Sequence, residues 1–126
     1  LGYIKALEKS QSGIYPSYFK KGMTVADITA KTVADAADAG DETAIEVYRI
    51  CAEQLGRGLS VLIDIINPEK IVIGSIFARS ENLIRESMEK MIRKEALPQS
   101  AVCCKVVPAI LGERIGDYAA VATALL

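Results

Sequence analysis

Residues 67–83 read NPEKIVIGSIFARSENL, and the apolar run near their start decides the fold class. Lys70–Ile73 is too short and too apolar for anything but a buried strand. The small pair Gly74-Ser75 follows at once, and helix-forming residues come after it. In α/β proteins such a strand-to-helix turn holds phosphates, although it can equally be a plain connector. The stretch predicts an α/β fold and marks Gly74 and Ser75 as candidate cofactor-binding residues.

A long amphipathic helix is expected before this strand. Asp41 can cap its start, and Asn67-Pro68 ends it near Ile66, because the residue before a proline avoids the α region. Apolar positions recur every three or four residues and predict one continuous stripe on a core. The stripe comprises Tyr48, Ala52, Leu55, Leu59, Leu62 and Ile66. Gly56 lies among small residues one turn apart, which favours close helix-on-sheet packing over the direct approach of a ligand.

The segments before this helix carry shorter signals. Residues 2–9 predict a short helix, and residues 14–22 form a loop with three aromatic rings, which we interpret as core or lid anchors. Thr24 begins a capping-box pattern, so a helix should open there. Gly40 is a favourable residue to end that helix.

After the Gly-Ser turn, the pattern continues as helix, strand and helix. Ser80 can cap a helix over residues 81–94, which is apolar on one side. Residues 102–107 are β-rich and predict a second strand. Asp117 can cap a small-residue helix that closes on Leu126.

The predicted elements divide the chain into two unequal parts. Residues 1–39 are expected to be peripheral helices and an aromatic loop, and residues 40–126 an α/β core segment. Two strands are too few to bury the faces of this many helices, because an isolated pair is marginal. The chain also begins at Leu1 rather than Met. We therefore expect a missing upstream part.

Composition excludes several classes of function. The net charge is −1 and no block of Lys or Arg occurs, so this chain alone should not bind nucleic acid. The three cysteines form no C-x-x-C pattern and the chain has no histidine, so no metal site is predicted. Reduced thiols indicate a cytoplasmic protein. No apolar run approaches the ~20 residues of a membrane span, and no signal peptide is visible.

Residues 40–75, which read GDETAIEVYRICAEQLGRGLSVLIDIINPEKIVIGS, resemble the C-terminal half of the ROK family, named for repressors, open reading frames and kinases. Four landmarks occur in order: Gly-Asp, Leu-Gly-x-Gly, Asn-Pro-x-x-Ile-Val-x-Gly and a final helix of small residues. The resemblance implies the two-lobed actin/hexokinase-like fold, in which the kinases phosphorylate sugars with ATP between the lobes. This chain then looks like the C-terminal portion of an actin-like ATPase (ribonuclease H-like) lobe, with helices packed on an incomplete sheet.

The resemblance also gives the Gly-Ser turn a role. In similar kinases this turn is Gly-Gly and lies against the nucleotide, so ATP with Mg²⁺ is the cofactor implied for the intact protein. Ser75 adds a side chain where glycine would supply freedom at positive φ, although its hydroxyl can donate to a phosphate oxygen. If Gly2-Tyr3 matches the end of the family's zinc cluster, Tyr3 replaces a metal ligand and Lys5 replaces the usual sugar-binding Glu.

The catalytic motifs of such kinases do not occur in this sequence. It has no Asp-x-Gly-x-Thr phosphate loop, no Asn-Asp general base and no cysteine-rich zinc cluster. Its acidic residues lie at helix starts or on exposed faces, and we interpret Asp64 and Asp117, which lie beside turns, as structural. We predict no catalytic residue, no bound zinc and no kinase activity for this chain alone.

Three functions stay open at this point. The first is the nucleotide-side lobe of an ATP-dependent, glucokinase-like sugar kinase. The second is the sugar-sensing part of a ROK-type repressor, and the third is a non-catalytic dimerisation module. The implied partners are a second copy of the chain, the missing N-terminal lobe, a sugar and a nucleotide. We expect the isolated chain to self-associate or to be marginally stable, because an incomplete sheet exposes an edge and an apolar face.

Overall fold

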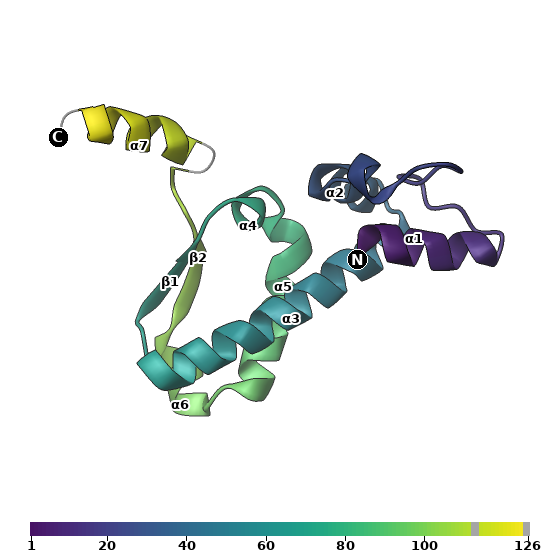
Figure 1. Cartoon of the computed structure of the whole chain (residues 1–126). Helices are drawn as coiled ribbons and strands as arrows, with labels where there is room; N and C mark the ends of the chain where they lie inside the picture. Colours follow the sequence, from purple (N-terminus) through teal and green to yellow (C-terminus); the bar gives the residue numbers. More distant parts are fainter. Residues whose placement is uncertain (112–113, 125–126) are drawn as a thin grey trace.

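The computed structural model describes residues 1–111 and 114–124, which are mostly helical with one small parallel sheet. In chain order the elements are α1 (Gly2–Gln11), the 3-10 turn η1 (Val25–Asp27), α2 (Ala30–Asp38), α3 (Glu42–Ile66), β1 (Lys70–Ile73), α4 (Ile76–Arg79), α5 (Glu81–Glu95), α6 (Pro98–Cys103), β2 (Lys105–Pro108) and α7 (Ile115–Ala124). Figure 1 shows α1 and α2 near the start of α3 and the two strands near its end.

The bounds of α3 confirm the sequence prediction at both ends. The Asp41 carboxylate accepts a hydrogen bond from the Ala44 N–H at 3.0 Å, which satisfies one of the free donors of the first turn. At the other end Asn67 takes a left-handed conformation with φ of 50°, and Pro68 follows. Gly40 has a φ of 91° just after α2, as expected of a helix-terminating glycine.

The start of α2 differs from the prediction. The capping box at Thr24 is present, because the Asp27 carboxylate accepts from the Thr24 N–H at 2.7 Å, but it closes only the short turn η1. The α-helix begins at Ala30, where Thr29 and Thr32 form a second capping box. Two competing boxes five residues apart divide the segment, and the second one starts the helix.

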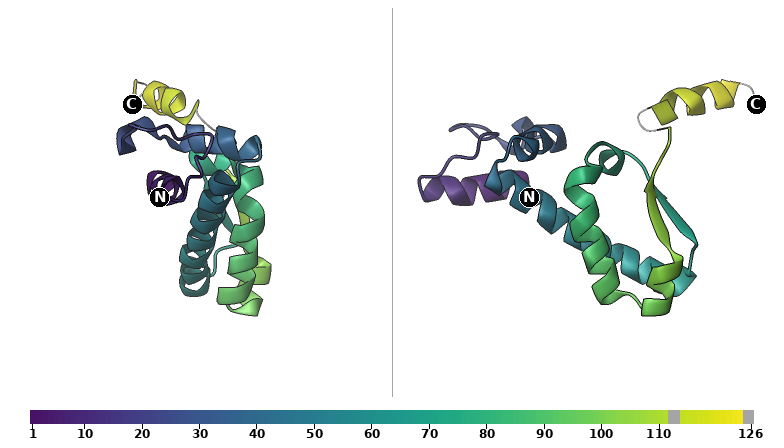
Figure 2. Two further views of the ribbon diagram at one scale, coloured as in Figure 1. Left: turned by 90° about the vertical axis from the view of Figure 1, so that its right-hand side faces the viewer. Right: turned by 180° about the vertical axis from the view of Figure 1, so that it is seen from behind.

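Much of the core lies between α3 and α5, which run side by side in the left view of Figure 2 and cross in the right view. Gly56 faces α5 so closely that an added Cβ would lie 2.6 Å from the Met88 carbonyl oxygen and 2.7 Å from the Met91 Cβ. The partner of the small-residue seam is therefore a helix, and the expected helix-on-sheet packing was wrong. A Cβ at Gly58, by contrast, would meet nothing within 4 Å.

The predicted apolar stripe of α3 was correct as far as Leu59 and wrong at Leu62 and Ile66. Tyr48, Ala52 and Leu59 are buried and Leu55 is partly buried. Toward the end of the helix the buried position is Ile63, with 1% exposure, whereas Leu62 and Ile66 are 46% and 65% exposed. A fixed three-to-four spacing does not say which of two neighbouring apolar positions faces the partner at each turn.

The sheet has two parallel strands within the described residues, with Ile71 opposite Val106 and Ile73 opposite Pro108. The strand β1 was predicted correctly, but it is not buried on both faces, since Val72 is 60% exposed. Parallel strands normally carry cover on both faces. One face of this pair therefore lacks cover in the described part of the chain.

The second strand begins later than predicted. Val102 and Cys103 belong to the short helix α6, and β2 starts only at Lys105. Pro98 stands at the first position of α6, where its fixed φ suits a helix and its missing N–H is not needed. Pro98 is therefore a helix-start signal, and it prevails over the strand propensity of the residues that follow it.

The aromatic loop anchors α1 to the rest of the molecule, as predicted for two of its three rings. Tyr18 and Phe19 are buried, and the Tyr18 hydroxyl donates to the Gly2 carbonyl at 3.0 Å. Burial is the main reason that the pKa of Tyr18 is raised to about 12. Tyr15 is exposed. The Ser17 N–H donates to the Asp41 carboxylate at 2.6 Å, so the cap of α3 also holds this loop.

The last described helix, α7, stands apart from the other helices in Figure 1. Asp117 lies inside its first turn rather than at its cap, because the helix begins at Ile115. The predicted end at Leu126 lies outside the described residues. Among the described residues, no helix combines the length and the apolar character that crossing a bilayer requires.

Candidate functional site

The two strands end at the same edge of the sheet, and this edge carries the turn predicted from the sequence. Gly74 follows β1 and Ala109 follows β2, and the Ala109 N–H donates to the Ile73 carbonyl at 2.9 Å. Figure 1 shows both strands leaving the sheet on the side where α4 and α7 lie. In open parallel sheets, ligands bind in the crevice outside the carboxyl ends of the strands.

Ser75 holds an unusual backbone conformation at this edge. Its φ is 54° and its ψ is −126°, a region that glycine occupies readily and that costs other residues about 1–3 kcal/mol. Gly74, in contrast, has no positive φ, and an added Cβ there would make an ordinary contact with Ala109 at 3.8 Å. The position that suits glycine is therefore the second one of the pair, where this sequence has serine.

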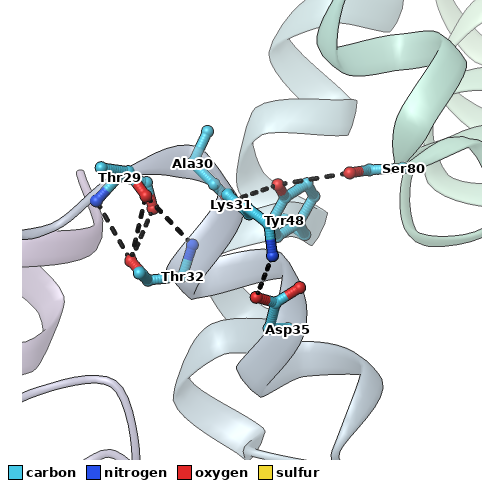
Figure 3. A network of polar contacts seen from close by, with 7 residues as sticks. All are labelled: Thr29, Ala30, Lys31, Thr32, Asp35, Tyr48 and Ser80. Carbon is cyan, nitrogen blue, oxygen red and sulfur yellow. Dashed lines mark hydrogen bonds and ion pairs between the residues drawn. The ribbon is translucent and has the colours of Figure 1, made fainter.

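The turn runs into a separate short helix, which the sequence did not indicate. Ser75 precedes α4 but its side chain makes no capping bond, so its exposed hydroxyl is not engaged by that helix. Ser80 was expected to cap α5, and it makes no capping bond either. Figure 3 shows its buried hydroxyl directed at Tyr48, 3.5 Å from the phenol oxygen. The Tyr48 hydroxyl donates to the Ala30 carbonyl at 2.9 Å and so joins α3 to α2.

A pocket of about 190 Å³ lies between α2 and α4, next to the turn. Its floor includes Tyr48 and Ser80, and its rim carries Lys31 and Asp35, which form an ion pair at 2.7 Å. The residues that line it are Ala30, Lys31, Ala34, Asp35, Asp38, Tyr48, Ile76, Arg79 and Ser80. Polar groups at the rim and an aromatic ring at the floor suit a small ligand with both polar and planar parts.

Arg85 on α5 joins the helix to the sheet and to α4. Its Nε donates to Glu81 at 2.7 Å and its Nη1 to Glu89 at 2.7 Å, one turn to either side. The same Nη1 donates to the Val106 carbonyl of β2 at 3.3 Å, and the guanidinium carbon lies 5.8 Å from the ring centre of Phe77. Hydrogen bonds and charge from Glu81 and Glu89 raise the pKa of Arg85.

Three acidic side chains, those of Asp27, Asp41 and Asp64, accept hydrogen bonds from backbone N–H groups. Asp64 accepts a hydrogen bond from the Leu97 N–H at 2.9 Å, which agrees with its structural interpretation. Asp27 and Asp41 hold N–H groups of their own turns. Among the described residues, no three His, Cys, Asp or Glu side chains are grouped to hold a metal ion.

Tyr3 and Lys5, which would stand at the family's zinc and sugar sites if Gly2-Tyr3 matched the end of the zinc cluster, also take part in packing. The Tyr3 ring meets Phe19 edge-on, with ring centres 5.9 Å apart. The Lys5 ammonium pairs with Glu46 of α3 at 3.2 Å and with Glu8 at 3.6 Å. A hydrogen bond to Glu46 is the main reason that the pKa of Lys5 is raised. The described contacts therefore tie α1 to α3.

Known proteins match this chain over nearly its whole length. The sequence profile of the ROK family matches residues 5–125. The DNA-binding transcriptional dual regulator NagC of Escherichia coli K12 is 29% identical over 123 residues, which are 96% of this chain and 30% of NagC. A glucokinase of Halalkalibacterium halodurans is 33% identical over 109 residues, which are 86% of this chain and 32% of that enzyme. The chain thus spans about a third of the length of these curated relatives.

A solved structure agrees with the fold. A putative sugar kinase from Cytophaga hutchinsonii superposes with a TM-score of 0.74 at 16% identity, over 98% of this chain and 40% of that one. This likeness confirms the predicted α/β fold, the C-terminal portion of an actin-like ATPase lobe with helices on a small sheet. The relatives include both sugar kinases and repressors, so these matches do not decide which activity this chain serves. The family, however, is clear: the chain belongs to the ROK family.

Proposed function

We propose that this chain is the nucleotide-side part of a glucokinase-like, ATP-dependent sugar kinase, and that Gly74 and Ser75 contact the nucleotide. The observation that carries the proposal is the backbone of Ser75, which keeps the glycine-type conformation at the carboxyl edge of a parallel sheet although the residue is serine. Strain of this kind persists mainly at functional sites. A relative named as a glucokinase, that of H. halodurans, supports the same assignment.

The surroundings of the turn fit a nucleotide. The phosphates would lie on the Gly74-Ser75 backbone and on the exposed Ser75 hydroxyl, which makes no cap bond. The base and ribose would extend toward the pocket between α2 and α4, where Tyr48, Asp35 and Lys31 stand. ATP supplies the transferred phosphoryl group, and Mg²⁺ would enter with its phosphates. We assign the general base and the sugar contacts to the N-terminal lobe that the proposal includes.

A second candidate function rests on the NagC match, which covers 96% of this chain. In that case the chain is the sugar-sensing part of a repressor, and the Gly-Ser turn serves only the fold. A third, a dimerisation module, is favoured by exposed apolar residues late in α3, among them Ile65 and Ile66 at 76% and 65% exposure. A homodimer is compatible with all three functions, and so is a cytoplasmic location.

Calorimetric titration of ATP and ADP into the longest natural form of the protein tests the proposal. Ser75→Gly is the variant at the turn itself. Gly58→Ala is the control, because a Cβ added at Gly58 meets no atom within 4 Å. We expect the parent to bind, Ser75→Gly to bind at least as tightly, and the control to match the parent. Binding by the glycine variant alone would favour the repressor or dimerisation function. No binding by either protein would contradict the nucleotide proposal.

A further inference from the structure

The guanidinium of Arg85 does more than pair with charges on its own helix. Its bonds to Glu81 and Glu89 are ordinary pairs between residues one turn apart, which contribute little by themselves. Two further contacts leave the helix: one reaches the Val106 carbonyl at 3.3 Å, and one places the cation 5.8 Å from the Phe77 ring centre. The carboxylates on either side fix the guanidinium where it can make both contacts.

The contact with Val106 lies on the outer edge of the sheet. The N–H groups of Lys105 and Ala109 donate to Glu69 and Ile73, so alternate residues of β2 face β1. Val106, which lies between them, directs its carbonyl to the opposite side. Arg85 therefore ties α5 to the free edge of β2, the strand whose end lies beside the Gly-Ser turn.

The contact with Phe77 fixes the far side of the turn. The helix α4 has only four residues, and Phe77 is its buried side chain, with 3% exposure. Phe77 stands two residues after Ser75, so the position of its ring limits the path of the turn. On the near side the turn is fixed by β1, through the Ala109 N–H bond to Ile73.

The strained conformation of Ser75 requires such fixing on both sides. A non-glycine residue at this φ and ψ relaxes unless the surrounding structure holds it in place. We propose that Arg85 is a positioning residue, which keeps the Gly74-Ser75 turn in its glycine-type conformation by holding Phe77 and the edge of β2. Its importance for ligand affinity rests on the function proposed above, whereas its effect on the turn does not.

Amide hydrogen exchange of the full protein tests the positioning role. Two protected amides report on the turn: Ser80, which donates to Ile76 in α4, and Ala109, which donates to Ile73. We expect Arg85→Met to raise exchange at both by about tenfold, because a cation–π contact and a hydrogen bond are lost. Adding Ser75→Gly should restore most of the protection of the Ser80 amide, since glycine takes the same conformation without strain.

Arg93→Met is the matched control. Arg93 lies on the same helix and also pairs with Glu89, at 3.5 Å, so that this ion pair stays within α5. Its loss should leave exchange at Ser80 and Ala109 within about twofold of the parent. Arg85→Lys keeps the charge but not the planar fork, so we expect an intermediate increase in amide exchange. This variant replaces Arg85→Met in the test if the methionine variant does not fold.

The outcomes separate this inference from the proposed function. Unchanged exchange at Ser80 in both Arg85 variants overturns the positioning role. A rise in exchange that Ser75→Gly does not reverse overturns it as well, because such a rise would indicate general loosening of the fold. If the parent binds ATP, Arg85→Met should weaken binding by about tenfold and Ser75→Gly should recover it. If the parent binds no ATP while exchange responds as expected, the proposed function fails and the positioning role stands.

Discussion

The helical pair α3 and α5 and the parallel pair β1 and β2 adjoin in the fold but differ in how completely the chain covers them. The helices close on each other along a seam where Gly56 touches the backbone at Met88. Each helix carries one of the two largest fully buried side chains, Ile63 on α3 and Met88 on α5. The strands expose Val72 on one face and carry helices on the other.

The helical pair buries its apolar face within this chain, whereas the pair of strands leaves one face without cover among the described residues. A helix pair satisfies its backbone hydrogen bonds internally and needs only an apolar face to bury. A parallel pair needs further strands and a second covering layer before it is stable. We infer that stability resides in the helical pair, whereas the proposed ligand site lies on the pair of strands.

The largest expected effect comes from breaking the helical side. Ile63→Ala should lower the free energy of unfolding by about 3 kcal/mol, because it opens a cavity at a side chain with 1% exposure. Val72→Ala in β1 is the corresponding change in the sheet. It should lower the free energy of unfolding by less than about 1 kcal/mol, since Val72 is 60% exposed. Urea unfolding followed by circular dichroism measures both. Equal losses would show that the sheet carries as much stability as the helices.

The two glycines of α3 sharpen the comparison further. Gly56→Ala should destabilise the protein by about 2 kcal/mol, because the new methyl group meets the Met88 carbonyl and the Met91 Cβ. Gly58→Ala has open space and should stabilise it by about 1 kcal/mol through helix propensity alone. Thermal unfolding of both variants shows directly whether each change stabilises or destabilises the protein. If Gly56→Ala were neutral, the helices would have room to move apart and the seam would not be tight.

A smaller, pH-dependent effect is expected at the start of α3. Burial alone would raise the pKa of Asp41, but hydrogen bonds from the Ser17 and Ala44 N–H groups outweigh it, and the net pKa is lowered. A lowered folded-state pKa contributes stability that is present above the unfolded value of about 3.9 and is lost as the pH falls through the folded value. Asp41→Ala should therefore reduce stability by about 1 kcal/mol at pH 7.

Measuring Asp41→Ala and the parent at a series of pH values checks the direction of this effect. The difference between them should shrink as the pH falls below about 3.9. Asp35→Ala is a suitable control, because the Asp35 carboxylate forms an exposed ion pair with Lys31 and its loss should change stability by less than about 1 kcal/mol. A difference for Asp41 that stays constant from pH 7 to pH 3 would show that its charge does not matter.

The sequence predicted those parts of the fold that carry local signals. The ends of α3 follow from Asp41 and from Asn67-Pro68, both of which act within a few residues. It failed where two local signals compete, as at the two capping boxes before α2, and at the start of α6, where Pro98 prevails over strand-forming residues. It also could not say that Ile63, rather than Leu62, is buried, because that depends on where the neighbouring elements lie.

The position of the Gly74-Ser75 turn was predicted, and its role in binding a cofactor stays a prediction. A strand followed by Gly-Ser located the turn, and the doubt about serine at a position that favours φ > 0 proved relevant, since Ser75 has that conformation. The sequence did not indicate the short helix α4, and the Tyr48–Ser80 and Arg85–Val106 contacts join segments far apart in the sequence. A four-residue spacing such as that of Glu81, Arg85 and Glu89 is typical of ion pairs along a helix, but it says nothing of the contact with β2.

Amide chemical shifts recorded during an ATP titration of the isotopically labelled longest natural form test the central claim most directly. The account predicts that the amides of Gly74, Ser75 and Ala109 shift together and saturate, because they share the carboxyl edge of the sheet. The amide of Gly56, in the seam between α3 and α5, should stay in place. Saturating ATP that leaves the amides of Gly74 and Ser75 unshifted would contradict the claim that this turn binds a nucleotide.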